Sequence, residues 1–228
     1  MAVVKKWRIY IEANILADWL LVETMKKVQR SKLSEGVIAS HRLVSFLLET
    51  QDDRIQAFTS YWAVFEALGV IKRASVLVWM VLDGMPVNLY SHVKDSERYE
   101  VQAGQLKKIQ RLINWLVKGD KRHHNLRVLS ETPDLEAGMS LILSKNLEAA
   151  DSFHVGIALS YGCDYFVTRD TDLDKIKTIL SKEKIEALTS REMVERLQSE
   201  GLFRFPRIQV ELRSTSGTEA KPNSSGSS

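Results

Sequence analysis

The stretch ADSFHVGIAL at 150–159, with GCDYFVTRDTD at 162–172 after it, decides the fold of this chain. Its pattern predicts an apolar helix, a tight turn and a short buried strand. Asp151 lies near the start of the helix, and three polar residues come at the end of the strand: Thr168, Asp170 and Asp172. Open α/β sheets bind their ligands at the carboxyl ends of the strands. Carboxylates gathered at that edge indicate a site for a hard divalent cation such as Mg²⁺ or Mn²⁺.

Strand and helix patterns alternate along the rest of the chain. Runs rich in β-branched and aromatic residues predict strands at 7–11, 55–59, 126–129, 165–168 and 185–188. Helical periodicity predicts helices between them, the longest running from Ser60 or Tyr61 to Leu82. Pro86–Tyr90 fits a strand or an extended loop. The alternation predicts an α/β fold, a three-layer α/β/α sandwich on a mainly parallel sheet of four to five strands.

The composition is that of an ordinary globular chain with a mildly basic charge. Of its 228 residues, 44% are hydrophobic, and the formal net charge of +3 permits a polyanionic substrate without demanding one. We expect one domain over 1–213 with a helical and loop insertion at about 84–125. The Ser- and Gly-rich residues 214–228 cannot bury enough apolar surface to fold, so we expect a disordered tail there.

The single cysteine and the lengths of the apolar runs indicate the cellular compartment in which we expect the protein. Cys163 cannot form a disulfide within the chain or a cysteine-based zinc site, and we expect it to be a buried, inert thiol. Residues 1–6 do not have the pattern of a signal peptide. No stretch reaches the roughly 18 uncharged residues of a membrane span. These features predict a soluble, cytoplasmic protein without a membrane partner.

Acidic residues follow or neighbour several of the predicted strands. They are Glu12, Glu66, Asp151, Asp170 and Asp172. Because parallel strands end at one edge of a sheet, these residues can converge although they are distant in sequence. Carboxylates brought together in a low dielectric repel one another, and a bound cation relieves that repulsion. A cation held in this way lowers the pKa of a bound water and stabilises charge on a phosphodiester, which is the chemistry of metal-assisted hydrolysis.

Four short motifs in this order resemble those of the PIN-domain nucleases, and in particular the VapC-like ribonucleases. The motifs are Glu12-x-Asn14, Thr59-Ser60 followed by Glu66, Asp151-x-x-His154, and Thr168-x-Asp170-x-Asp172. The resemblance implies a PIN-like fold and a metal-dependent endoribonuclease that uses Mg²⁺ or Mn²⁺. It also implies that Glu12, Glu66, Asp151 and Asp170 are the catalytic and metal-binding acids. Asp172 then matches an accessory metal ligand, while Asn14, Ser60 and Thr168 hydrogen-bond the acids or their waters.

The chain departs from the family pattern at its first acid, which is usually Asp and here is Glu12. One extra methylene moves the carboxylate by about 1.5 Å, and Mg²⁺ demands near-ideal octahedral geometry. A catalytically weakened, PIN-like RNA-binding or regulatory module is therefore the alternative function, and a phosphatase or 5′-nuclease on a related sandwich is a third. The expected partners are RNA, an antitoxin if the protein is a toxin of a toxin–antitoxin pair, and a second copy of the chain. His154 is expected to be a core histidine that hydrogen bonds satisfy, rather than a catalytic base.

Overall fold

A parallel sheet forms the centre of the molecule. The computed structural model describes residues 6–24, 33–95, 101, 103–118, 125–130, 133, 135–170 and 173–203. Its strands are β1 (Trp7–Ile11), β2 (Ile55–Ser60), β3 (Leu126–Leu129), β4 (Tyr165–Val167) and β5 (Glu186–Leu188). They lie in the order β3-β2-β1-β4-β5, and every neighbouring pair is parallel. The predicted strands and the α/β class are thus confirmed.

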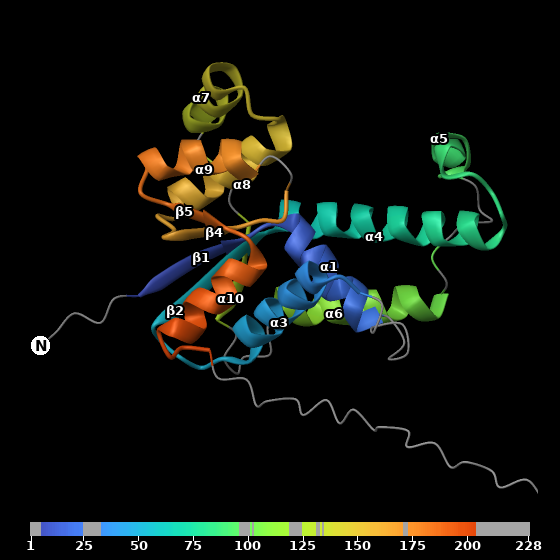
Figure 1. Cartoon of the computed structure of the whole chain (residues 1–228), viewed down its shortest axis with the longest axis horizontal. Coiled ribbons are helices and arrows are strands. Elements are labelled where there is room, and N and C mark those ends of the chain that lie inside the picture. The colour runs from blue at the N-terminus through green and yellow to red at the C-terminus, as the bar shows by residue number, and fades with distance from the viewer. Residues whose placement is uncertain are drawn as a thin grey trace, which may run out of the picture.

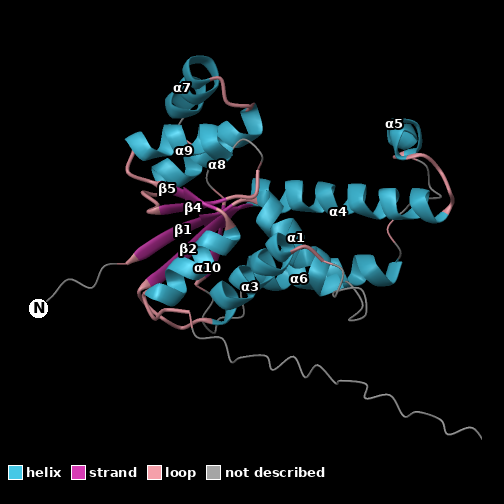
Figure 2. Ribbon diagram, in the orientation of Figure 1, coloured by secondary structure: helices cyan, strands magenta, loops and turns pink. Residues whose placement is uncertain are grey.

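Helices cover both faces of the sheet and make it the middle layer of three (Figures 1 and 2). One face carries α1 (Ala13–Thr24), α3 (Glu35–Glu49), α4 (Tyr61–Leu82), α6 (Ala103–Lys118) and α10 (Ser190–Ser199). The other carries α7 (Leu135–Lys145), α8 (Ala149–Ser160) and α9 (Leu173–Lys182). Strand alternation creates the two cores: Ile9 and Ile11 face the first group of helices, whereas Tyr10 faces the second.

The chain changes direction across the sheet between β1 and β4. From β1 it passes to β2 and β3 through helices on one face, and from β3 it returns to β4 and β5 through helices on the other. At the carboxyl end of this strand pair, Ile11 is in register with Val167, and the Glu12 N–H donates to the Val167 carbonyl at 3.1 Å. Open α/β sheets bind ligands at such a switch point, because the loops diverge there and leave a crevice.

Local signals in the sequence place the helix ends around this edge. Ser60 ends β2 and caps α4, because its Oγ accepts the Ala63 N–H at 3.0 Å. Asn146, with a φ of 53°, follows α7 at the break expected near Lys145. Because α8 leads through a short turn into β4, it begins at the carboxyl edge of the sheet, where α4 also begins.

The expectation of a strand or an extended loop at Pro86–Tyr90 is wrong. A short 3₁₀ helix, η1 (Val87–Leu89), leads directly into α5 (Tyr90–Val93). Tyr90 and Val93 pack against Val76 and Met80 of α4 and form a small separate core. That local apolar contact stabilises a helical turn, whereas a strand would need a hydrogen-bonding neighbour. Figure 1 shows α4 running away from the sheet with α5 near its far end.

Two further expectations concern residues that the structure describes only in part or not at all. The proposed tail at 214–228 lies outside them, and of the insertion at 84–125 the structure describes η1, α5, α6 and their immediate surroundings. Cys163 is a free thiol and is buried, as expected, and burial raises its pKa to about 12. Among the described residues, no helix is both long and apolar enough to span a membrane.

Candidate metal centre

Three carboxylates from three parts of the chain meet at the switch point. Glu12 directly follows β1, Asp170 comes three residues after β4, and Asp151 lies in the first turn of α8. One carboxylate oxygen of each lies within 4.8 Å of the other two. We call these three residues the acid cluster. The atoms that these residues offer to a metal ion are all carboxylate oxygens, the ligand type that hard divalent cations prefer.

Glu12 is the most deeply buried member of the acid cluster. Its side chain points toward the Tyr10 face of the sheet, and only 4% of its surface is exposed. Burial is the main cause that raises the pKa of Glu12 to about 7, and the charges of Asp151 and Asp170 act in the same direction. A hydrogen bond from Thr168 and the nearby His154 partly offset that rise. A cation between the three carboxylates would offset the cost of burial and the repulsion between the acids, because it favours the ionised form, so the residues fit a bound metal ion.

Two neutral side chains fix the geometry around Glu12, and both were expected from the sequence. Asn14 Nδ2 donates to Glu12 Oε2 at 3.0 Å and to Thr168 Oγ1 at 3.3 Å. The Asn14 amide oxygen accepts the Arg169 backbone N–H at 3.1 Å, and Thr168 Oγ1 accepts the Asp170 N–H at 2.9 Å. Asn14 and Thr168 therefore tie the turn after β4 to the acid that follows β1, which orients two members of the cluster together.

Glu66, the remaining acid that the family resemblance implied, is not one of the cluster. Its Oε2 lies 2.6 Å from Nε2 of His154, a residue that is only 1% exposed. The His154 Nδ1 lies 2.9 Å from the Tyr10 hydroxyl, and Tyr10 donates to Ser60 Oγ at 3.1 Å. We call Ser60, Tyr10, His154 and Glu66 the histidine chain. His154 is thus a buried histidine with both ring nitrogens hydrogen-bonded, as expected.

Ser60 and Tyr10 both belong to the histidine chain. Ser60 caps α4 and is linked to Glu66 through Tyr10 and His154, and its expected hydrogen bond to an acid or a bound water stays a prediction. Tyr10 belongs to none of the four motifs, although it lies two residues before Glu12 and faces the core beneath α7, α8 and α9. Asp172 lies outside the described residues, so its expected role as a ligand stays a prediction.

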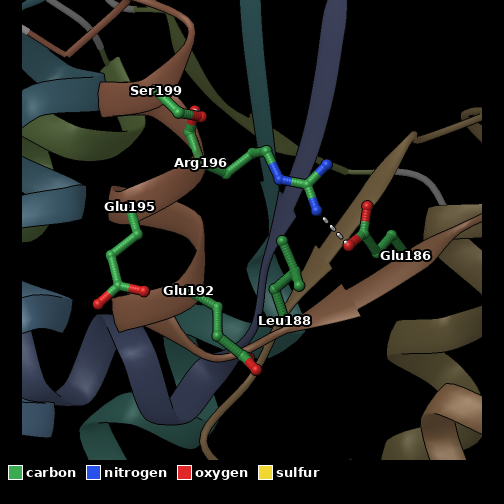
Figure 3. A pocket seen from close by; sticks show the side chains of 6 residues that line it. All are labelled: Glu186, Leu188, Glu192, Glu195, Arg196 and Ser199. Atoms are coloured by element: carbon green, nitrogen blue, oxygen red, sulfur yellow. Dashed lines mark hydrogen bonds and ion pairs between the residues drawn. The ribbon is translucent and has the colours of Figure 1, made fainter.

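A hollow of about 370 Å³ lies away from this centre, between β5 and α10 (Figure 3). Arg196 lines it and forms an ion pair with Glu186 at 2.8 Å. Its other lining residues are Leu188, Glu192, Glu195 and Ser199. None of these residues belongs to the acid cluster or the histidine chain.

Comparison with known proteins gives a family match over most of the chain. The family model described as "PIN domain" matches residues 9–179. None of the curated proteins that were compared matches the chain. Among solved structures, the chain is similar to "Crystal Structure of PAE2754 from Pyrobaculum aerophilum", with 15% identity and a TM-score of 0.40 over 87% of this chain and 99% of that one.

Proposed function

Because the chain belongs to the PIN domain family, whose members are generally metal-dependent nucleases, we propose that it is a metal-dependent endoribonuclease. The observation that carries the proposal is the acid cluster, in which Glu12, Asp151 and Asp170 converge at the switch point of the sheet. Mg²⁺ or Mn²⁺ is the proposed cofactor, since both favour carboxylate oxygens. RNA is the proposed substrate, and its phosphodiester bond is the bond hydrolysed.

The chain's own residues have separate proposed tasks. Glu12, Asp151 and Asp170 would hold the cation, and Asn14 and Thr168 keep two of these acids oriented toward each other. When bound, the cation supplies an activated water near neutral pH and stabilises charge on the phosphate. No nucleophilic side chain is needed. Asp172, two residues after Asp170 in the sequence, is the proposed further ligand.

Glu66 is proposed to act at the margin of the site. His154 holds one carboxylate oxygen of Glu66, and the Glu66 side chain keeps 29% of its surface exposed. The exposed part can accept a hydrogen bond from the attacking water and orient it. In this arrangement, Glu66 contributes to catalysis through the water and the histidine chain determines its position.

An RNA cleavage assay tests the proposed function. Purified protein is incubated with a labelled single-stranded RNA and Mn²⁺ or Mg²⁺, with EDTA and an Asp151→Asn variant as controls. We expect cleavage that needs the metal and is lost in the variant. Intact RNA with every metal would refute the nuclease proposal, and if binding persisted it would favour an RNA-binding or regulatory module.

Glu12 is the observation that favours an RNA-binding or regulatory module as the second candidate function, because this position is usually Asp in the family. A panel of DNA flaps and small phosphoesters tests the third alternative, a 5′-nuclease or phosphatase. Cleavage of RNA alone within that panel supports the main proposal. Preferential cleavage of DNA flaps or phosphoesters would instead favour this third alternative.

A toxin role, with an antitoxin or a second copy of the chain as partner, is the most specific form of the proposal. A cytoplasmic location belongs with it, and the buried free thiol of Cys163 is compatible with a reducing compartment. The neighbouring reading frames provide a direct check. A small adjacent gene for a DNA-binding protein would favour the toxin role, and its absence would favour RNA processing.

A further inference from the structure

Asp18 is a buried acid that the proposed mechanism does not use. It lies in α1 among apolar residues, and only 3% of its surface is exposed. Its Oδ1 forms an ion pair with a terminal nitrogen of Arg169 at 3.0 Å. Burying a carboxylate is costly unless a cation and hydrogen bonds compensate for lost hydration. Asp18 therefore holds the Arg169 guanidinium in one place.

Arg169 is also fixed at its backbone, and that backbone belongs to the candidate metal centre. It lies between Thr168 and Asp170, and its N–H donates to the Asn14 amide oxygen at 3.1 Å. Asn14 and Asp18 are four residues apart in α1, which is about one helical turn. The guanidinium is therefore held about one turn along α1 from the residue that orients Glu12.

The Arg169 side chain keeps donors available to a ligand. It is 44% exposed although it is paired with a buried acid. A guanidinium has five N–H donors in a planar fork, and this fork matches the oxygens of a phosphate. The acid cluster repels a polyanion, so an anchored cation at its border would offset that repulsion and fix one phosphate.

We propose that Arg169 binds a phosphate of the RNA next to the candidate metal centre, and that Asp18 is the positioning residue that orients its guanidinium. The inference rests on the proposed function for its substrate class. It assigns to Arg169 a phosphate contact outside the acid cluster. It also explains why the buried Asp18 carboxylate pairs with a half-exposed arginine that directly precedes Asp170.

The salt dependence of RNA binding tests this assignment. Binding of a labelled single-stranded RNA is measured by fluorescence anisotropy in EDTA, where metal-dependent cleavage cannot occur, between 50 and 200 mM KCl. The matched control is Arg196→Gln, because Arg196 is 42% exposed, pairs with Glu186 at 2.8 Å and lines the hollow between β5 and α10. The two variants remove the same charge from the molecule at two different places.

We expect Arg169→Gln to bind more weakly and to make the slope of log affinity against log salt shallower by about 0.7, the value of one phosphate contact on a single strand. Over this fourfold salt range, wild type then loses about 2.6-fold more affinity than Arg169→Gln does. Arg196→Gln keeps the wild-type slope. Equal slopes for wild type and Arg169→Gln, or equal changes in both variants, would overturn the proposal.

Two conservative variants separate binding from a structural role. Arg169→Lys keeps the charge and loses the fork, so we expect the wild-type slope with weaker binding. Asp18→Asn leaves the arginine charged but poorly oriented, so we expect an unchanged slope and a loss of affinity of about 2- to 10-fold. If circular dichroism shows that Arg169→Gln is unfolded, Arg169→Lys becomes the deciding variant. A salt slope for Arg169→Lys that is shallower than the wild-type slope by about 0.7 would contradict the proposal.

The outcomes for this inference and for the proposed function are distinguishable. If wild type cleaves RNA and Arg169→Gln shows the wild-type slope of log affinity against log salt, the nuclease function stands and the phosphate contact is wrong. If wild type binds RNA with an Arg169-dependent slope and never cleaves it, the phosphate contact stands and the nuclease function is wrong.

Discussion

The acid cluster and the histidine chain lie at the same edge of the sheet, but their carboxylates have different neighbours. In the cluster, Glu12 lies beside two other acids, and its pKa is raised to about 7 mainly by burial. In the chain, Glu66 is held by the imidazole of His154 at 2.6 Å. The first arrangement favours a cation from solution, whereas the second already contains a basic partner.

This difference divides the acids that the family motifs place in one group. Glu12, Asp151 and Asp170 are the proposed metal ligands, and Glu66 is a proposed acceptor for water. An acid's role therefore depends on what its side chain contacts across the fold as well as on its place in a motif. Substitutions in the acid cluster and in the histidine chain can break or sharpen this division.

The largest difference is expected between Asp170→Asn and Glu66→Gln. Loss of a group that supports a metal site without binding the metal costs about 10- to 100-fold in activity or metal affinity, and loss of a ligand costs more. We therefore expect RNA cleavage to fall by more than about 100-fold in Asp170→Asn and by about 10- to 100-fold in Glu66→Gln. Initial rates with saturating Mn²⁺ measure both. Equal losses would remove the distinction between cluster and chain.

The pH dependence of the metal-free protein tests Glu12. Its pKa is raised in the folded state, so between about pH 4.5 and 7 the folded protein keeps a proton that the unfolded chain has released. Stability is therefore lost as the pH rises through this window. One pKa unit corresponds to about 1.4 kcal/mol, so Glu12→Gln should raise the free energy of unfolding by about 3 kcal/mol at pH 8 and have little effect at pH 4. Urea unfolding in EDTA measures this, and a gain that is the same at both pH values would contradict it.

The histidine chain predicts a smaller cost for His154→Leu. The substitution leaves the Tyr10 hydroxyl and the Glu66 carboxylate without their shared partner. A hydrogen bond to a charged group contributes about 1.5 to 3 kcal/mol, so we expect a destabilisation of about 2 kcal/mol. A double-mutant cycle with Glu66→Gln isolates the pair. A coupling energy near zero would show that His154 and Glu66 do not depend on each other.

The smallest effect is expected for Glu12→Asp, which restores the usual acid of the family. The shorter side chain keeps the carboxylate and shifts it by about one bond length. We expect cleavage to stay at the wild-type rate or to rise by a few-fold. A variant without activity would show that the site requires the longer side chain, and that Glu12 is not a substitute for Asp.

Much of the fold could be predicted because the periodicities are clear. The alternation at 7–11 and the long apolar helix after Ser60 appear in the structure with nearly the expected bounds. The convergence of Glu12 with Asp151 and Asp170 followed from one rule, that parallel strands end at a shared edge. That rule depends on strand order and not on side-chain detail, which is why the sequence was sufficient.

What could not be predicted depends on packing between distant elements. Glu66 and His154 are 88 residues apart, and their contact exists because α4 and α8 both begin at the carboxyl edge of the sheet. The turn at 87–89 became helical because Tyr90 has apolar partners on α4. Neither contact leaves a periodic signal in the sequence.

Calorimetric titration of the purified protein with Mn²⁺ tests the central claim most directly. The claim is that Glu12, Asp151 and Asp170 together bind the metal and that Glu66 does not. We predict that wild type and Glu66→Gln bind Mn²⁺ with affinities within about tenfold of each other, whereas Asp151→Asn loses more than about 100-fold in affinity. Mn²⁺ affinity that survives in Asp151→Asn and disappears in Glu66→Gln would contradict the account.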